Sequence, residues 1–177
     1  IVNKSILSKI KNNINKFISS ISKPRKVLIL VPSGPALDEV ISLLTQNLDS
    51  NDILIDGGNT NPNVSFENHQ TIKSKNLLYL GMGVSGGVKG VLQGPSIMIG
   101  GDTNAFDQVK NIFTQITSKT INGSKSFEFF GDSNQGHFVK MIHNGIEYVE
   151  MQLISSIYYL MINSKKWRGK DQLIVIG

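Results

Sequence analysis

Apolar residues along the chain form two kinds of pattern that alternate with each other. Short runs rich in apolar residues occupy positions 27–31, 52–56, 77–80, 96–99 and 127–130. Segments between these runs repeat apolar residues at every third or fourth position, which predicts helices over 36–46, 62–74 and about 103–116. A succession of strand, helix and strand is typical of a mostly parallel sheet with helices on both faces. The pattern therefore predicts an α/β fold.

Two further helices are expected at the ends of this pattern. Residues 1–21 are amphipathic, and the helix would end before Pro24. Its apolar face would be formed by Val2, Ile6, Ile10, Ile14, Phe17 and Ile21. A long helix begins near Gln135. The run at 27–31 is apolar without alternation, which predicts a strand covered on both faces.

Three glycine-containing turns follow three of the predicted strands. They are Pro32–Gly34, Gly57–Asn59 and Gly81–Gly87. Because the carboxyl ends of parallel strands meet at one edge of the sheet, where ligands bind, these turns should lie together. Residues 81–86 formally match GxGxxG, but further glycines follow, so we interpret 81–94 as a substrate loop and not as a phosphate-binding helix start.

The predicted helix at 136–148 carries a polar stripe. Four polar side chains share one face through spacings of three, four and seven residues: Lys140, His143, Asn144 and Glu147. The other faces carry Met141, Ile142, Ile146 and Val149, so we expect the helix to be buried on most sides. A polar stripe on a buried helix either pairs internally or lines a site. In a site, the lysine and the carboxylate could serve as base and acid.

Composition narrows the classes of ligand. Lys plus Arg number 18 against 13 Asp plus Glu, and the net charge of +5 suits an anionic ligand. The basic residues are spread out, with one cluster at 23–26 and one at 165–170, and apart from Trp167 neither is interleaved with aromatic residues, which disfavours a nucleic-acid partner. The chain has no Cys and three separated His residues, a pattern that does not indicate a metal site. No apolar run is long enough to span a membrane.

Several stretches resemble the 6-phosphogluconate dehydrogenases, the decarboxylating enzymes of the oxidative pentose phosphate pathway. They are IDGGN at 55–59, MGVSGG at 82–87, GPS at 94–96 with GG at 100–101, and GHFVKMIHNGIEY at 136–148 followed by MQL at 151–153. The resemblance runs from about residue 23 to residue 163. The related 3-hydroxyacid dehydrogenases share the SGG loop and the helix lysine, but HNGIEY is not expected in them.

The resemblance implies a role for each matching position. Lys140 would be the general base that takes the proton of the sugar 3-hydroxyl, and Glu147 the acid that protonates the enediol after CO2 leaves. Substrate would be bound by Asn59, Ser85, Gly86, Gly87, His143, Asn144 and, at the phosphate, Tyr148. The cofactor NADP would lie against Val31, Pro32, Ser33 and Asn59. Oxidation at C3 creates a ketone β to the carboxylate, which supplies an electron sink for decarboxylation without a metal.

The resemblance also implies an organisation for the chain. Residues 1–133 would form part of a Rossmann-like, doubly wound parallel sheet that binds NADP, and 134–177 would begin an all-α C-terminal domain with its first long helix. The full-length enzyme is expected to be a cytoplasmic homodimer without membrane or nucleic-acid partners. The family's first strand and GxGxxG are expected before Ile1, so we expect the isolated chain to be inactive.

Two departures from the family leave alternatives open. The turn Pro32–Gly34 stands where the family has Lys-Ala-Gly, and residues 165–176 have no match. The chain could instead belong to a related 3-hydroxyacid dehydrogenase. His143 and Tyr148 discriminate between the two families, because an enzyme for a small unphosphorylated acid does not need them. It could also be a non-catalytic remnant of an enzyme.

Overall fold

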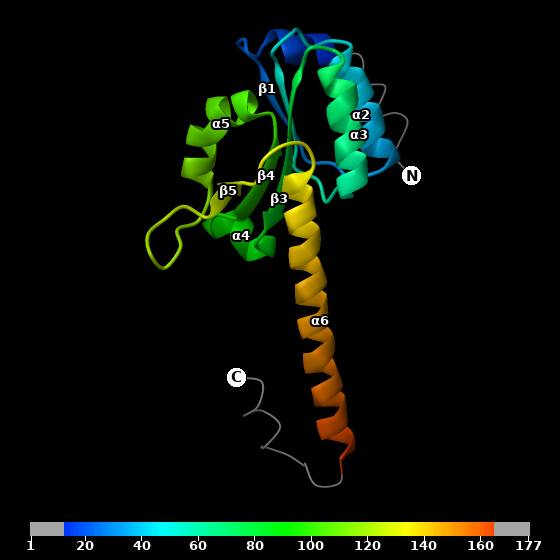
Figure 1. The fold of residues 1–177 in the computed structure, drawn as a ribbon, viewed down its shortest axis with the longest axis vertical. Helices are drawn as coiled ribbons and strands as arrows, with labels where there is room; N and C mark the ends of the chain where they lie inside the picture. Colours follow the sequence, from blue (N-terminus) through cyan, green and yellow to red (C-terminus); the bar gives the residue numbers. More distant parts are fainter. Residues whose placement is uncertain (1–12, 165–177) are drawn as a thin grey trace. The chain divides into compact units, whose positions relative to one another are not determined.

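The computed structural model describes residues 13–164, which include five strands in one sheet (Figure 1). The chain forms two compact units, residues 1–141 and residues 142–177. The first unit contains the sheet. Its strands lie in the order β1-β2-β3-β4-β5, which is also their order along the chain.

The elements follow the predicted alternation. They are β1 (Lys26–Ile29), α2 (Pro35–Thr45), β2 (Ile53–Asp56), α3 (Pro62–Lys73), β3 (Leu78–Ser85), α4 (Gly87–Gln93), β4 (Ser96–Gly101), α5 (Thr103–Ile116), β5 (Phe127–Phe129) and α6 (Gln135–Asn163). Residues 13–19 are also helical, so the described part of the predicted N-terminal helix is confirmed. The predicted positions Val2, Ile6 and Ile10 lie outside the described residues.

The sheet is mixed but mostly parallel. Strand β2 pairs in parallel with β1 and with β3, and β4 pairs in parallel with β5. Strands β3 and β4 are antiparallel, because the short α4 connection between them does not provide a crossover. Helices α2 and α3 cover one face of the sheet and α5 covers the other (Figure 1). The α/β, Rossmann-like, doubly wound prediction is therefore confirmed, with β4 and β5 running opposite to β1, β2 and β3.

The core has one half on each face of the sheet. On β2, Leu54 packs in a cluster with residues of α2 and α3, whereas Ile53 and Ile55 pack in a cluster with residues of α5. Adjacent residues of a strand point to opposite faces, so an uninterrupted apolar strand such as β2 supplies both halves.

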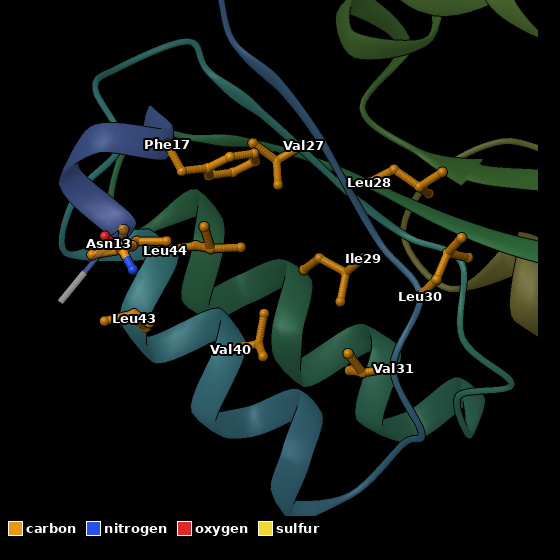
Figure 2. Close-up of a pocket in the computed structure, with 11 residues that line it drawn as sticks. Asn13, Phe17, Val27, Leu28, Ile29, Leu30, Val31, Val40, Leu43 and Leu44 are labelled. Carbon is orange, nitrogen blue, oxygen red and sulfur yellow. The ribbon is translucent and has the colours of Figure 1, made fainter. Parts of the chain in front are cut away.

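The prediction that residues 27–31 are covered on both faces is wrong. Val27 and Ile29 are buried on the α2 side, but Leu28 is 46% exposed and Leu30 67% exposed. Figure 2 shows the two leucines on the side of the strand away from α2. The reason is that β1 is the edge strand of the described sheet, and no described helix covers that face there.

An apolar cavity of about 370 Å³ lies beside this edge strand. It is bounded by the helical residues 13–17, by 27–31 and by α2, whose Val40, Leu43 and Leu44 face it (Figure 2). The helix at 13–19 turns Ile14 and Ile18 into the core and leaves Phe17 49% exposed. Phe17 was predicted on the apolar face of the helix. It is not buried in the core, and it forms part of the wall of this apolar cavity.

The substrate loop predicted over residues 81–94 is also wrong in its local structure. Strand β3 continues to Ser85, pairing with β4 as far as Ser85 opposite Ser96, and α4 follows directly. The glycines misled the prediction, because glycine is rare inside strands unless another backbone approaches closely. The residues predicted to bind substrate still lie at the carboxyl end of β3.

The described part of the second unit is a single helix, the continuation of α6 over 142–163. The prediction that this helix is buried on most sides is not borne out: Met141, Ile142, Ile146 and Val149 are each between 46% and 60% exposed. No other described element of this unit covers the apolar side chains of the helix. Among the described residues, no helix has both the length and the hydropathy of a membrane span.

Candidate functional site

Two turns at the carboxyl ends of β1 and β2 lie against each other. A methyl group on Gly58 would lie 3.0 Å from the carbonyl oxygen of Val31, so the backbones of the two turns are nearly in contact. The side chains predicted to meet the cofactor, Pro32, Ser33 and Asn59, are exposed there. The expectation that these turns share one sheet edge is confirmed, since β1, β2 and β3 are parallel.

Asp56, the last residue of β2, holds the turn that carries Asn59. Its Oδ1 accepts a hydrogen bond from the Gly58 amide at 3.0 Å, and its Oδ2 accepts one from the Thr60 hydroxyl at 2.8 Å. Asp56 is fully buried, so both bonds also compensate the loss of water around its carboxylate. The two bonds bracket Asn59 and fix the backbone on both sides of it.

The first turns of α6 rest on a surface made of glycine backbone. We call it the glycine seat, and it consists of Gly81 and Gly83 on β3, Gly100 on β4 and Gly136 on α6. A methyl group on Gly100 would lie 2.5 Å from the Gly136 nitrogen, and one on Gly83 would meet Cβ of Lys140 and lie 2.9 Å from its Cγ. The formal GxGxxG match thus has a packing role at its first two glycines, which admit the helix to the sheet.

The glycine seat places Lys140 next to the strand end that was predicted to bind substrate. Side chains two residues apart on a strand share a face, so Gly81, Gly83 and Ser85 point to the side where α6 begins. Ser85 lies roughly 7 Å beyond Gly83 along β3, a distance that an extended lysine side chain can span. Gly86 and Gly87 follow Ser85 with positive φ angles of 139° and 54° and are exposed.

A chain of buried hydrogen bonds runs beneath this region. His137 Nδ1 lies 2.8 Å from the Ser65 hydroxyl, which lies 3.0 Å from the Tyr79 hydroxyl. Tyr79 in turn donates to Asp56 Oδ2 over 3.4 Å. All four side chains belong to residues that are at most 2% exposed. The chain joins α6, α3, β3 and β2, and we call it the His137–Asp56 chain.

Burial and charge shift the ionisation of this chain. Burial lowers the pKa of His137, against the opposing effects of the Asp56 carboxylate and the backbone carbonyls of Gly58 and Asp56. Burial, together with the charge of Asp56, raises the pKa of Tyr79. Both shifts favour the uncharged forms, so the imidazole is neutral and the phenol keeps its proton at neutral pH.

Tyr79 is fixed from its other side by a second polar pair. The His69 ring stacks on the Tyr79 ring with 5.4 Å between centroids, and His69 Nε2 lies 3.2 Å from Asp102 Oδ1. Asp102 Oδ2 accepts a hydrogen bond from the Tyr79 amide at 2.8 Å. Burial acts to raise the pKa of Asp102, but His69 and the Tyr79 amide outweigh it and lower that pKa. Asp102 occupies the N-cap position of α5 without a side-chain capping bond, and its carboxylate makes these contacts instead.

The second unit carries the remaining predicted residues on α6. His143 Nδ1 lies 3.7 Å from Glu147 Oε2 and 3.4 Å from Asn144 Oδ1, so these three side chains form one polar group. Tyr148 is 69% exposed. The roles of these residues in substrate binding and catalysis stay predictions.

Sequence reasoning missed the buried polar residues that support the site. Thr60, Ser65, His69, Tyr79 and His137 are separated along the chain, and no local spacing connects them. The sequence does indicate such residues in one way: polar side chains, such as that of Tyr79, lie within otherwise apolar predicted strands and helices. Among residues 13–164, no three His, Asp or Glu side chains gather as metal ligands would.

The fold and the site define a class of protein. A Rossmann-like sheet, with exposed turns at its carboxyl edge and a lysine-bearing helix seated on its glycines, is the architecture of a nucleotide-dependent dehydrogenase domain followed by a helix. The family model for the NAD binding domain of 6-phosphogluconate dehydrogenase matches residues 2–124, and the model for its C-terminal domain matches residues 136–173. The expectation that residues 165–176 have no match is therefore wrong for residues 165–173. The chain belongs to the 6-phosphogluconate dehydrogenase family.

Individual relatives agree with this assignment. The decarboxylating 6-phosphogluconate dehydrogenase of Staphylococcus epidermidis is 44% identical over 149 residues, which cover 84% of this chain and 32% of the relative. The solved Plasmodium falciparum 6-phosphogluconate dehydrogenase, studied with its cofactor NADP+ and its substrate 6-phosphogluconate, superposes with a TM-score of 0.80 at 41% identity, covering 87% of this chain and 33% of that one. The chain thus spans about a third of the length of these relatives.

A more distant structure shares the fold. The 3-hydroxyisobutyrate dehydrogenase of Mycobacterium tuberculosis has a TM-score of 0.68 at 20% identity, covering 77% of this chain and 45% of that one. At that identity the likeness shows the fold alone.

Proposed function

We propose that this chain forms part of an enzyme that oxidises and decarboxylates 6-phosphogluconate to ribulose 5-phosphate and CO2 with NADP. The observation that carries the proposal is the placement of Lys140: its Cβ lies against Gly83, within side-chain reach of the Ser85 end of β3. The family assignment supports it independently, because the Staphylococcus epidermidis relative is a decarboxylating 6-phosphogluconate dehydrogenase and the Plasmodium falciparum relative binds NADP+ and 6-phosphogluconate.

The exposed turns at the sheet edge fit the cofactor. Val31, Pro32, Ser33 and Asn59 would hold NADP, because their backbones meet closely at the carboxyl ends of two parallel strands. When bound, NADP accepts the hydride from C3 of the sugar acid. Asp56 keeps the Asn59 turn in place through its two hydrogen bonds, so Asn59 can contact cofactor and substrate together.

Proton transfers would be carried out by two residues of α6. Lys140 Nζ takes the proton of the 3-hydroxyl as the C3–H bond breaks and the C3 carbonyl forms. The bond from C2 to the carboxylate then breaks, CO2 leaves, and Lys140 returns its proton to the C3 oxygen as the enediol forms. Glu147 donates a proton to C2 while Lys140 takes the proton of the C3 hydroxyl back, which gives the ketone product. Ser85, Gly86, Gly87, His143 and Asn144 would hold the carboxylate and hydroxyls, and Tyr148 the phosphate.

The wider setting belongs to the same proposal. The enzyme would be a cytoplasmic homodimer acting in the oxidative pentose phosphate pathway and gluconate utilisation, without nucleic-acid or membrane partners. The organisation into a cofactor-binding domain over 1–133 and a helical domain beginning at 134 also stays a proposal.

The test uses the polypeptide that the gene encodes, with the 177-residue chain assayed beside it. NADPH formation and CO2 release are measured with 6-phosphogluconate and, as a competing substrate, 3-hydroxyisobutyrate. Turnover of 3-hydroxyisobutyrate alone would assign the protein to the related dehydrogenases, and turnover of neither would support a non-catalytic remnant. Activity of the 177-residue chain by itself would contradict the expectation that it is inactive.

Two variants test the assigned roles. Lys140→Ala should lower turnover by ~10²–10⁴-fold, because it removes the general base. The matched control is Lys110→Ala, an exposed lysine on α5. Glu147→Ala should slow formation of ribulose 5-phosphate more than the first-turnover formation of NADPH, with Glu150→Ala as control on the same helix. Equal and small losses at 140 and 147 would count against both roles.

A further inference from the structure

We propose that His137 is a positioning residue of this site, and that the His137–Asp56 chain sets the position of Lys140 relative to Asn59. The proposal rests on the proposed function for its kinetic consequences. His137 is 2% exposed and lies one helical turn before Lys140. Because it is enclosed beneath the glycine seat, it acts through its neighbours and not on substrate.

Donor and acceptor capacities fix the direction of the hydrogen bonds. Tyr79 has a single hydroxyl proton and donates it to Asp56 Oδ2. The Tyr79 oxygen then accepts from Ser65, and the Ser65 oxygen accepts from His137. In this arrangement the neutral His137 donates from Nδ1, and its Nε2 is buried without a hydrogen-bond partner.

The two ends of the chain meet the two halves of the site. At one end, Asp56 holds Gly58 and Thr60, the neighbours of Asn59. At the other end, His137 is part of the helical turn that presents Lys140 to Gly83. A shift of one end is transmitted to the other through four fully buried side chains.

The glycine seat makes room for this link. A methyl group on Gly81 would lie 2.9 Å from His137 Nδ1 and 2.9 Å from the Ser65 hydroxyl. Residue 81 must therefore lack a side chain for the two groups to meet. This gives the glycine a second purpose beside the close approach of the helix to the sheet.

Three variants separate positioning from simple packing. His137→Leu fills the space without a donor, and His137→Asn keeps a donor near the place of Nδ1. Tyr79→Phe keeps the ring and removes the hydroxyl that joins Ser65 to Asp56. Tyr159→Phe, which removes an exposed hydroxyl on α6, is the control. All are made in the polypeptide that the gene encodes, and their folding is checked by circular dichroism.

The kinetic readout is kcat for 6-phosphogluconate oxidation with NADP. His137→Leu and Tyr79→Phe should lower kcat on the order of 10- to 100-fold, because small misplacements of a catalytic group have effects of this size. KM should change much less, and His137→Asn should retain most of the activity. Equal losses in the Leu and Asn variants, or an unchanged kcat in Tyr79→Phe, would overturn the proposal.

A spectroscopic readout keeps this test separate from the proposed function. With nitrogen-labelled histidine, NMR should show His137 as the Nδ1–H tautomer in the wild type, and Tyr79→Phe should shift its ring signals. Absence of that tautomer, or no response to Tyr79→Phe, would refute the chain as described. If instead the signals are as expected but the wild type oxidises neither sugar acid nor hydroxyacid, the proposed function fails and the kinetic role of His137 fails with it.

Discussion

Gly136→Ala tests the glycine seat most directly. The new methyl group would meet the carbonyl oxygen of Gly81 and would lie 2.6 Å from the Gly100 nitrogen and 2.7 Å from the Met98 carbonyl oxygen. All three atoms belong to the backbone of β3 or β4, so no side chain can rotate away. The helix must move off the sheet, or the strands must separate locally.

The change in the free energy of unfolding caused by Gly136→Ala follows from two opposing contributions. Overpacking a well-packed site costs about 1–3 kcal/mol, and alanine recovers at most about 1 kcal/mol of helix propensity. The balance is a loss of stability, and a loss of about 1–3 kcal/mol would lower the melting temperature by roughly 2–12 °C for a chain of this size. Gly145→Ala is the matched control on the same helix, because a methyl group there has no atom within 4 Å apart from the nearby backbone of its own helix. It should raise stability by about 0.5–1 kcal/mol.

The assay is urea and thermal unfolding followed by circular dichroism, with wild type and both alanine variants side by side. We expect Gly136→Ala to lower the free energy of unfolding and Gly145→Ala to raise it. If Gly136→Ala were as stable as Gly145→Ala, the close contact between α6 and the sheet would be wrong, and the placement of Lys140 would lose its support.

Three other outcomes follow from the structure. Asp52→Ala should lower the unfolding midpoint more than Asp49→Ala, since it leaves the buried Arg25 guanidinium without its buried partner, whereas the Asp49 side chain is 53% exposed. Leu30→Lys should reduce aggregation measured by light scattering at equal concentration, because it replaces an exposed leucine with a charge directly after the edge strand β1, and charge there opposes strand addition. Because burial places the pKa of His137 below 6.5, the unfolded state takes up a proton first as the pH falls, and stability should be lost from about pH 6.5 downward. Urea midpoints over that range should show a smaller loss in His137→Asn, and an identical slope would argue against a buried neutral imidazole.

Much of the fold could be predicted from the sequence because it depends on local patterns. The apolar runs at 52–56 and 96–99 lie within one to two residues of β2 and β4. The parallel arrangement of β1, β2 and β3 followed from the helices between them, and it correctly brought the turns at 32–34 and 57–59 to one edge.

The failures have a common physical origin in contacts between distant parts of the chain. Gly81 and Gly83 resemble loop residues in any local window, and their strand conformation is explained by α6, which begins more than fifty residues later. The exposure of Leu28 depends on which helix covers which face, and the run VLILV does not contain that information. The His137–Asp56 chain likewise joins residues that are 72 positions apart at its Ser65 step.

The residues of the candidate site also fall into two groups, those that a local pattern predicts and those that depend on contacts between distant parts of the chain. Lys140, His143, Asn144 and Glu147 could be proposed from helix spacing together with the resemblance, because both depend on one continuous segment. The residues that hold the site in shape, such as Ser65 and Tyr79, could not, because they matter through three-dimensional contacts alone.

The glycine seat has a consequence for the genetics of this family. In a core built of side chains, a bulky substitution can be rescued by a second mutation that shrinks a neighbour. At Gly136 the neighbours are main-chain atoms of Gly81, Met98 and Gly100, and no residue is smaller than glycine. A suppressor screen that starts from Gly136→Ala should therefore recover reversion at codon 136 and few compensating changes elsewhere in the gene.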